Sequence, residues 1–424
     1  MRGSVSHYLE QALSRPDFVL SRVKCVFFRE ARSQCSAQDS VAVRPDIRNP
    51  FATVRVSRQF DPDLRARWRA FESVALFSPY QCLEWYECWL GTAGRARHEV
   101  PLVVEAFDAE GTLTLILPLV AARRGPVVIA KFPGDKHTNA NFPLIHPNVV
   151  VGEEVIGALL ARLAESAPGI DLYWFDALPA QWSGRPNPLL RASRSPHSAT
   201  GSVIDLRLDH VNSRLSRQRS SHRKLIKLGA RIRRVEGQAE VNTAMAAFFD
   251  QKSAWFRDRR LPDAFGRLGV TAFLAKLFNR TEGVAELYAL DLEGTPVAVA
   301  GLLVTAGRAC LMFISYDGRH PWARLGLGTH LVRSLIQLMG HRGIAQFDFG
   351  LGDAEYKRLL GADTERFFVL AQPITVKGRV AAIALLTASR MKALLKASPK
   401  LLTVAQHARW LASRRQRSQP ASDG

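Results

Sequence analysis

Two stretches of the chain carry the same succession of apolar runs and polar turns. Residues 106–112 read AFDAEGT and residues 289–295 read ALDLEGT, and each stands between strand-like apolar runs. The acidic residue, glycine and threonine between those runs are typical of a hairpin turn. The two patterns stay in register until residues 131–134 face residues 315–317. Both stretches therefore predict a β-hairpin followed by a further strand.

A helical pattern follows each set of strands, at residues 152–165 and 328–340, and a short apolar run follows each helix. In the second helix the apolar residues recur at the spacing of a helix face. The order of hairpin, strand, helix and strand thus occurs twice, which indicates two related domains rather than a solenoid. We predict an α/β (α+β) fold with two tandem domains, each a mixed, mostly antiparallel central sheet flanked by helices.

The pattern also sets the expected boundaries of these domains. Residues 1–50 mix Ser, Arg, Gln and Pro without sustained periodicity, and we expect a disordered extension there. The first domain is expected at 51–205 and the second at 206–375. Residues 376–424 are expected to form a basic helical tail with a disordered end, because apolar residues recur at helical spacing between Lys and Arg.

Composition places the chain among soluble globular proteins. Its 424 residues are 47% hydrophobic and 23% charged, and no apolar run approaches the ~20 residues of a membrane helix. The N-terminus lacks the apolar segment of a secretion signal, so we expect a cytoplasmic protein. The five cysteines form no C-x-x-C pair, which argues against a zinc site or a disulfide framework, and we expect no metal.

The formal net charge of +20 suggests an anionic partner: nucleic acid, an anionic membrane surface or a polyphosphorylated small molecule. Residues 207–234 hold many basic residues and one acid, Asp209, and the tail from Val376 holds one acid, Asp423. A solvated face with a disordered tail is the alternative to a binding role. The tail helices either pack on the domain or lie on anionic lipid at the inner membrane, with Trp410 at the interface.

The stretch ARLGLGTHLV at 323–332 places two glycines directly before the second repeat's helix. No G-x-x-x-x-G-K-[ST] surrounds them, so the stretch is not a nucleotide P-loop. A helix start exposes backbone N–H groups and the positive end of the helix dipole, which together favour an anion such as pyrophosphate. Gly326 and Gly328 let a ligand approach the backbone closely. The first repeat has no glycine pair at this place, so we expect binding in the second repeat only.

A strand, then R/Q-x-x-G-x-G/A, then a helix resembles the GNAT acyl-CoA N-acyltransferase fold. Over residues 55–375 the chain resembles the GNAT-like proteins associated with bacterial cellulose biosynthesis (CelD/BcsL type). The likeness is carried by FSPYQCLEWYECWL at 77–90, SRLSRQRSSHRKLIKL at 213–228, ISYD at 314–317 and FDFGLGDAEYKRLLG at 347–361. One departure is Ala323, which stands where the family has Gln or Arg, with Arg324 one place later.

The resemblance implies two GNAT-like domains and acyl transfer from acetyl-CoA or another acyl-CoA to a sugar or amine acceptor in exopolysaccharide or cellulose biosynthesis. The first domain lacks the glycine cradle, and the second is expected to bind the coenzyme and to be catalytic. The expected coenzyme-binding residues are Arg324, Leu325, Gly326, Leu327, Gly328 and Thr329.

Three residues are candidates for the chemistry, which needs a base for the acceptor proton and an acid for the leaving thiolate. Asp317 ends a strand beside the site and is either the base or a solvated loop carboxylate. Asp348 is either a buried base or a cap of the turn at Gly350 and Gly352. Tyr356 resembles the family's tyrosine that protonates the coenzyme A sulfur, and packing of an aromatic ring is its alternative.

Trp255 and Trp322 are candidates for stacking on an acceptor sugar, with core or rim packing as the alternative. Lys357 is a candidate for contact with phosphate or acceptor, or a solvated lysine. Tandem GNAT-like domains also occur in aminoacyltransferases that use aminoacyl-tRNA to build peptidoglycan cross-bridges, and tRNA is the less favoured partner; DNA is not expected. A third hypothesis is that the protein is a non-enzymatic scaffold that keeps the GNAT fold.

Overall fold

The computed structural model describes residues 50–150, 152–190, 195–207, 219–352, 357–358, 360 and 362–397. All of these residues lie in one unit of the chain, Asp46–Gly424. The extension expected at residues 1–50, apart from Pro50, lies outside the described residues, as does the tail beyond Ala397.

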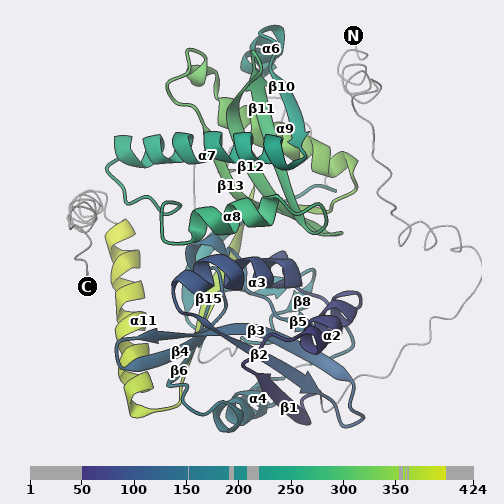
Figure 1. Ribbon diagram of the computed structural model, residues 1–424, viewed down its shortest axis with the longest axis vertical. Helices are drawn as coiled ribbons and strands as arrows, with labels where there is room; N and C mark the ends of the chain where they lie inside the picture. The colour runs from purple at the N-terminus through teal and green to yellow at the C-terminus, as the bar shows by residue number, and fades with distance from the viewer. Residues whose placement is uncertain are drawn as a thin grey trace, which may run out of the picture. The chain divides into compact units, whose positions relative to one another are not determined.

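The first repeat follows the predicted order of hairpin, strand, helix and strand (Figure 1). Its elements are β1 (Thr53–Ser57), α2 (Pro62–Glu72), α3 (Leu83–Trp89), β2 (Val100–Phe107), β3 (Leu113–Arg124), β4 (Val127–Lys131), β5 (Leu144–Ile145), α4 (Glu153–Ser166), β6 (Leu172–Pro179), the short strands β7 (Gln181–Trp182) and β8 (Arg185–Pro186), and β9 (His197–Asp205). The turn at 108–112 joins β2 to β3, where the sequence predicts a hairpin.

The second repeat has the same order, preceded by a short helix. Its elements are α6 (Arg219–Lys227), β10 (Arg231–Val235), α7 (Gln238–Asp258), α8 (Val270–Phe278), β11 (Ala285–Leu292), β12 (Thr295–Val304), β13 (Arg308–Tyr316), the 3-10 turn η5 (Ala323–Leu325), α9 (Leu327–His341), β14 (Gln346–Leu351) and β15 (Asp363–Pro373). Helix α11 (Val376–Ala397) follows. α9 is thus the counterpart of α4, and β13 and β14 are the counterparts of β4 and β6.

Among the described residues, both repeats contribute to one 13-stranded sheet with the order β1-β2-β3-β4-β6-β15-β9-β14-β13-β12-β11-β10, and β5 pairs with β3 beside this path. The described pairings in it are antiparallel except β4 with β6 and β13 with β14. The predicted mixed, mostly antiparallel sheet flanked by helices is therefore confirmed. The long apolar runs of β3 and β12 are buried almost throughout, as expected of strands covered on both faces.

The two repeats exchange their last strands at the centre of the sheet. β15, from the second repeat, pairs with β6 of the first, and β9, from the first repeat, pairs with β14 of the second. β9 and β15 also pair with each other. The division into domains at 205 and 206 stays a prediction, because the sheet passes through this boundary without a break.

Helices of the two repeats also pack on each other. The rings of Trp85 and Trp89 on α3 lie 4.8 and 5.1 Å from the ring of Phe273 on α8, in edge-to-face geometry. α3 and α8 hold the same place in their repeats, each before the hairpin (Figure 1). Such pairs of buried aromatic rings are favourable beyond the area they bury. The repeats thus share one apolar core across their contact.

Helix α11 packs on the sheet, as one of the two expectations for the tail requires. Ala382 is buried against Ile129 of β4 and Leu172 of β6 (Figure 1). A side chain at Gly378 would collide with the backbone of Asp171, so the helix lies directly against the start of β6. The segment expected to be helical at 400–412 lies outside the described residues. In the part of the chain that the structure describes, no helix combines the length and the apolarity that crossing a membrane requires.

Candidate active site

The parallel strands β13 and β14 part soon after they begin. Arg308 to Cys310 pair with Gln346 to Asp348, whereas β13 continues to Tyr316. From Leu311 onward, the edge of β13 that faces β14 therefore has no partner strand among the described residues. A strand edge of this kind presents N–H and C=O groups that an extended ligand can pair with.

The glycine turn lies between the end of β13 and helix α9. Gly326 takes the left-handed conformation with φ of 76°, which glycine adopts at little cost, and it precedes the first residue of the helix. Gly328 is buried, and a Cβ there would meet the ring of Tyr316 at 3.1 Å. Tyr316 therefore lies against the start of α9, and a side chain at 328 would require its ring to shift.

The backbone N–H groups at this turn are not all available to a ligand. The N–H groups of Leu325 and Gly326 already donate to the carbonyls of Trp322 and Ala323, at 2.9 and 3.0 Å. The first helical bond comes from the N–H of His330 to the carbonyl of Gly326. Helix geometry leaves the N–H groups of residues 327–329 without a partner inside the helix. Of the six predicted coenzyme-binding residues, these three offer N–H groups to an anion, and Arg324 is exposed beside them.

A small recess lies beside the same helix start, on the side facing α6. It is lined by Ser221 and His222 of α6, by Leu325 and Gly326 of the turn, and by Thr329, His330 and Arg333 of α9. The Nδ1 atoms of His222 and His330 are 2.8 Å apart, so one ring donates a proton to the other. Burial, the other histidine and Arg333 lower the pKa of His330 to about 3, and burial and Arg333 lower the pKa of His222.

Asp317 and Trp322 lie at the end of β13, next to the glycine turn. Asp317 is half-buried, and its Oδ1 accepts a hydrogen bond of 2.9 Å from the N–H of Arg319. Trp322 packs partly on the core below α9, and the Nζ of Lys224 lies 5.3 Å from its ring centre. Asp317 thus directly follows Tyr316, whose ring lies against Gly328, and the carbonyl of Trp322 accepts from the N–H of Leu325 in the glycine turn.

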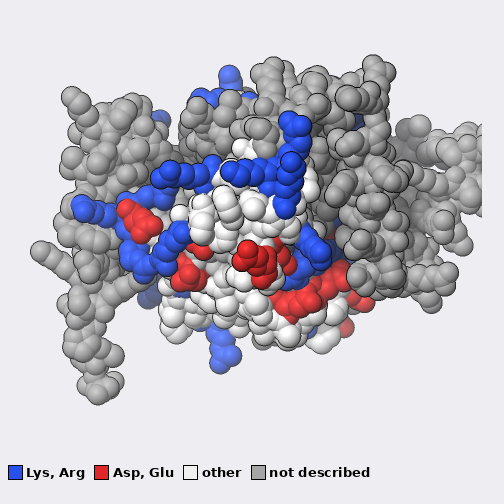
Figure 2. Space-filling model, turned by 90° about the horizontal axis from the view of Figure 1, so that it is seen from above, with Lys and Arg blue, Asp and Glu red and all other residues white. Residues whose placement is uncertain are grey.

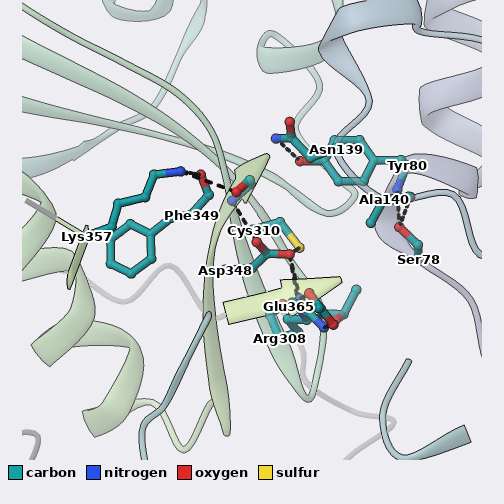
Figure 3. Close-up of polar contacts among 12 residues, drawn as sticks. Ser78, Tyr80, Asn139, Ala140, Arg308, Cys310, Asp348, Phe349, Lys357 and Glu365 are labelled. Atoms are coloured by element: carbon teal, nitrogen blue, oxygen red, sulfur yellow. Dashed lines mark hydrogen bonds and ion pairs between the residues drawn. The ribbon is translucent and has the colours of Figure 1, made fainter. Parts of the chain in front are cut away.

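Asp348 lies at the centre of the sheet, 1% exposed, in a group of buried charges (Figure 3). Its Oδ2 pairs with the guanidinium of Arg308 at 2.8 Å, and its Oδ1 accepts from the N–H of Gly350 at 2.7 Å. Arg308 also pairs with Glu365 of β15 at 2.6 Å and lies over the ring of Trp182. Burial lowers the pKa of Arg308, but Asp348 and Glu365 outweigh it, so the pKa is raised.

This geometry supports the turn-capping interpretation of Asp348, because both of its oxygens have partners. A further role as a base stays a prediction. The neighbouring thiol of Cys310 lies 3.8 Å from Oδ2, and burial raises its pKa well above the usual value. The thiol is therefore neutral and is not a nucleophile in this structure.

Lys357 is buried, and its Nζ donates to the carbonyls of Phe349, Gly350 and Gly352, at 3.2, 3.3 and 2.8 Å (Figure 3). An ammonium group has three donors, and these bonds hold the end of β14. Contact between Lys357 and the acceptor stays a prediction. Tyr356, the predicted general acid, lies outside the described residues.

Trp255 lies on α7, one turn after Gln251. Gln251 accepts from the hydroxyl of Ser315 on β13 at 2.7 Å, so this part of α7 is fixed near the end of that strand. The Trp255 ring stands between two cations, Lys252 at 5.3 Å and Arg259 at 4.4 Å. Burial and Arg259 lower the pKa of Lys252 to about 8.

Sequence reasoning did not include His222, His330 or Arg333 among the candidate site residues. Gly326, His330 and Arg333 follow one another at the spacing of a helix face, which was a usable signal for the part on α9. The part on α6 had no such signal, because His222 is 108 residues away from His330 along the chain.

A larger cavity of about 470 Å³ lies in the first repeat, at the start of α4. Its lining is mainly apolar and includes Phe142, Ile145, Ile156 and Leu190, together with Phe368 of β15 from the second repeat. Within the described residues, no group of three or more His, Cys, Asp or Glu side chains could hold a metal ion.

The sequence of the second repeat has a recognisable relative. Residues 212–358 match the family model described as the acetyltransferase (GNAT) domain. The matched segment contains α6, the glycine turn, α9 and β14, and so includes the site described above. No curated protein matches the chain.

Matches to solved structures cover about three quarters of the chain. FemX is 11% identical, with a TM-score of 0.52, and the match covers 74% of this chain and 96% of that one. L-PGS from Bacillus licheniformis is 13% identical (TM-score 0.47, covering 78% and 96%). A tandem GNAT protein from the clavulanic acid biosynthesis pathway is 14% identical (TM-score 0.42, covering 76% and 99%). At these identities the likeness to FemX shows a fold, and the GNAT match supports an acyltransferase.

Proposed function

We propose that this protein is an acyl-CoA-dependent acyltransferase that uses acetyl-CoA and acylates an amine or hydroxyl group of a sugar or amine acceptor. The observation that carries the proposal is the start of α9. It presents the N–H groups of residues 327–329 next to a left-handed glycine, where β13 parts from β14. The matched GNAT domain contains this turn.

The coenzyme's pyrophosphate suits the start of α9, because that end of the helix carries partial positive charge and unpaired N–H groups. Helix α9 has no acidic residue in its first turn to compete for this place. Arg324 stands where its charge would add to the attraction. The unpaired edge of β13 suits the amide groups of the coenzyme's pantetheine arm, which can pair as an added strand does.

The chemistry assigned to the site is direct transfer. The acceptor nitrogen or oxygen attacks the thioester carbonyl, and Asp317 takes the proton that the acceptor loses. The carbon–sulfur bond then breaks, and Tyr356 gives its proton to the departing coenzyme A sulfur. Trp322 and Trp255 are proposed to bound the acceptor site, and an acceptor that stacks on Trp255 has to displace Lys252 or Arg259 from its ring.

The cellulose-biosynthesis setting is proposed from the sequence resemblance alone. We also propose a cytoplasmic location with peripheral contact to the anionic inner membrane. Helix α11 supports this contact, because Val376, Val380, Ile383 and Met391 are exposed and its first turn holds no acid. Vesicle co-sedimentation of the full chain and of a chain ending at Ala397 tests it: anionic vesicles should carry both down and neutral vesicles neither. If anionic vesicles carry down only the full chain, the residues beyond 397 make the contact and α11 does not.

The proposed donor is tested by thermal unfolding of the purified protein with acetyl-CoA or with aminoacyl-tRNA. A ligand at about 100 times its Kd stabilises the folded state by about 2.7 kcal/mol, which raises Tm by a measurable amount. We expect a rise with acetyl-CoA only. If Tm rises with aminoacyl-tRNA only, the donor is the charged tRNA and not acetyl-CoA. If Tm rises with neither ligand, the protein is a non-enzymatic scaffold with a GNAT fold.

A further inference from the structure

The recess between α6 and α9 contains a buried cation with no described counter-charge. Arg333 is 7% exposed, and its Nε has no hydrogen-bond partner within the described part of the chain. Burial alone lowers the pKa of Arg333, with no carboxylate acting in the opposite direction. Arg342 and Arg308, by comparison, have carboxylate partners at 2.6 Å. A guanidinium buried without an anion is unfavourable, so its place indicates a site for one.

The groups around Arg333 point to the same kind of ligand. Thr329 and His330 of α9 and Ser221 and His222 of α6 supply hydroxyl and imidazole groups, and Gly326 begins the helix at the rim. Two exposed side chains of α6 near the recess, Arg223 and Lys224, are basic. Seen from the end of the molecule where α6 and β10 lie, Lys and Arg side chains form a row across part of the described surface, with Asp and Glu side chains beside them (Figure 2). The exposed basic side chains of α6 attract an anion.

The size of the recess limits what enters it. The recess is open on one side, and the room inside it is about 10 Å³, about one water molecule. One oxygen of a tetrahedral anion can enter while the rest of the anion stays at the opening, whereas a nucleobase or a sugar does not fit inside. The recess also differs from the N–H groups of residues 327–329, because Gly326, Thr329, His330 and Arg333 lie along the side of α9 that faces α6.

We propose that this recess binds a phosphomonoester dianion, with its oxygens against Arg333 and the two histidines, and that binding is accompanied by proton uptake at the histidine pair. Without ligand, His222 and His330 are neutral, and Arg333 is the cation that faces both rings. A dianion beside them favours the charged imidazolium, which donates from both nitrogens. The proton comes from solvent.

Two sources can supply this phosphate: the 3′-phosphate of coenzyme A or free inorganic phosphate. The first source rests on the proposed function, and the second does not. Calorimetry on the full-length protein with coenzyme A, 3′-dephospho-coenzyme A and inorganic phosphate separates them. Arg333→Met removes the charge, and Lys227→Met on α6 is the control that removes an exposed positive charge outside the recess.

We expect Arg333→Met to weaken coenzyme A binding roughly 10- to 100-fold, the range of a charge-assisted hydrogen bond, and Lys227→Met to leave it unchanged. Dephospho-coenzyme A should bind the wild type more weakly and should be insensitive to Arg333→Met. If inorganic phosphate alone depends on Arg333, free phosphate is the ligand. If phosphate binds in this way and coenzyme A does not bind, the proposed function fails and the phosphate site stands.

Proton uptake is measured from binding enthalpies in two buffers of different ionisation enthalpy at pH 7. We expect uptake in the wild type and none in His330→Asn. Should Arg333→Met not fold, His222→Asn on the half-buried side of the recess carries the affinity test. Equal affinity for all three ligands in the wild type, Arg333→Met and His222→Asn would overturn the proposal, as would binding without proton uptake.

Discussion

Helices α4 and α9 occupy the same place in the two repeats but begin differently. α4 follows Gly152, and its sequence begins with Glu153 and Glu154. α9 follows a left-handed Gly326 and starts with Leu, Gly and Thr. The sequence at the helix start is therefore acidic in the first repeat and uncharged in the second, where we propose that an anion binds.

The cavities near the two helix starts also differ, in size and in lining. The first repeat has a largely apolar cavity of about 470 Å³ there, and the second has a recess of about 10 Å³ beside a buried arginine. The apolar cavity thus lies near the first helix start, and the group of polar and basic side chains lies near the second. The predictions below test this division, beginning with the centre of the sheet, where the second repeat has Asp348 and the aligned residue of the first is Trp174.

The largest effect is expected for Asp348→Asn. Removing one charge from the buried group leaves Arg308 poorly compensated, and breaking a buried ion pair costs about 3–5 kcal/mol of unfolding free energy. Asp363→Asn, an exposed carboxylate on β15, is the control and should change stability little. Urea unfolding measures both. Wild-type stability together with lost turnover would instead make Asp348 a catalytic base.

The next prediction tests whether acetyl-CoA binds at the start of α9 and not at the start of α4. Gly328→Glu places bulk against Tyr316 and a negative charge at the start of α9, and we expect acetyl-CoA affinity to fall by about 100-fold or more, or roughly 2.7 kcal/mol. Gly152→Glu makes the same change at α4, where a Cβ meets no atom within 4 Å, and should leave affinity unchanged. Calorimetry with circular dichroism as a check on folding gives the answer. Unchanged affinity in Gly328→Glu removes the assignment of the donor site.

Tyr356→Phe tests whether the second repeat carries the chemistry. The change keeps the ring and removes the proton donor, so turnover should fall by roughly one to two orders of magnitude while the Kd for acetyl-CoA stays the same. Initial rates and calorimetry on the same preparations separate the two quantities. Equal turnover in both proteins would assign Tyr356 to packing.

The smallest expected effect is a loss of folding stability as pH falls. The prediction compares one buried histidine from each repeat. His330 in the second repeat and His137 in the first have pKa values lowered to about 3 and about 4, mainly by burial. Unfolded histidine takes up a proton below about pH 6.5 and these folded ones do not, so stability falls as pH drops from about 6.5 towards 4. Phosphate should reduce this loss in the wild type and in His137→Asn, but not in His330→Asn. Thermal unfolding between pH 7 and pH 5 is the measurement; equal protection of all three proteins would contradict it.

Local features of the fold could be predicted from the sequence. The hairpins, helix α9 and the glycine turn each depend on residues close together in the chain, and periodicity and turn chemistry indicate such elements directly. The packing of α11 on β4 and β6 was one of two open alternatives, because an apolar helix face indicates burial without indicating the partner.

The missing parts of the site depend on distant residues. Arg308 and Asp348 are 40 residues apart, and no pattern around either one indicates its partner. The recess needs α6 beside α9, and the sequence showed α6 only as part of a basic segment. The strand exchange was missed for a related reason: β9 and β15 lie beyond the two matching stretches of sequence, and pairing across repeats leaves no trace in local periodicity.

The exchanged strands have a consequence for synthesis on the ribosome. β6 is complete at Pro179, but its partner β15 begins only at Asp363. The edge of β6 therefore has no β15 to pair with until nearly all of the second repeat has been translated. An uncovered strand edge is prone to pair with other chains, and contacts this distant form slowly. Nascent chains halted before Asp363 should therefore aggregate rather than release a folded first repeat, and the two halves of this protein mature together or not at all.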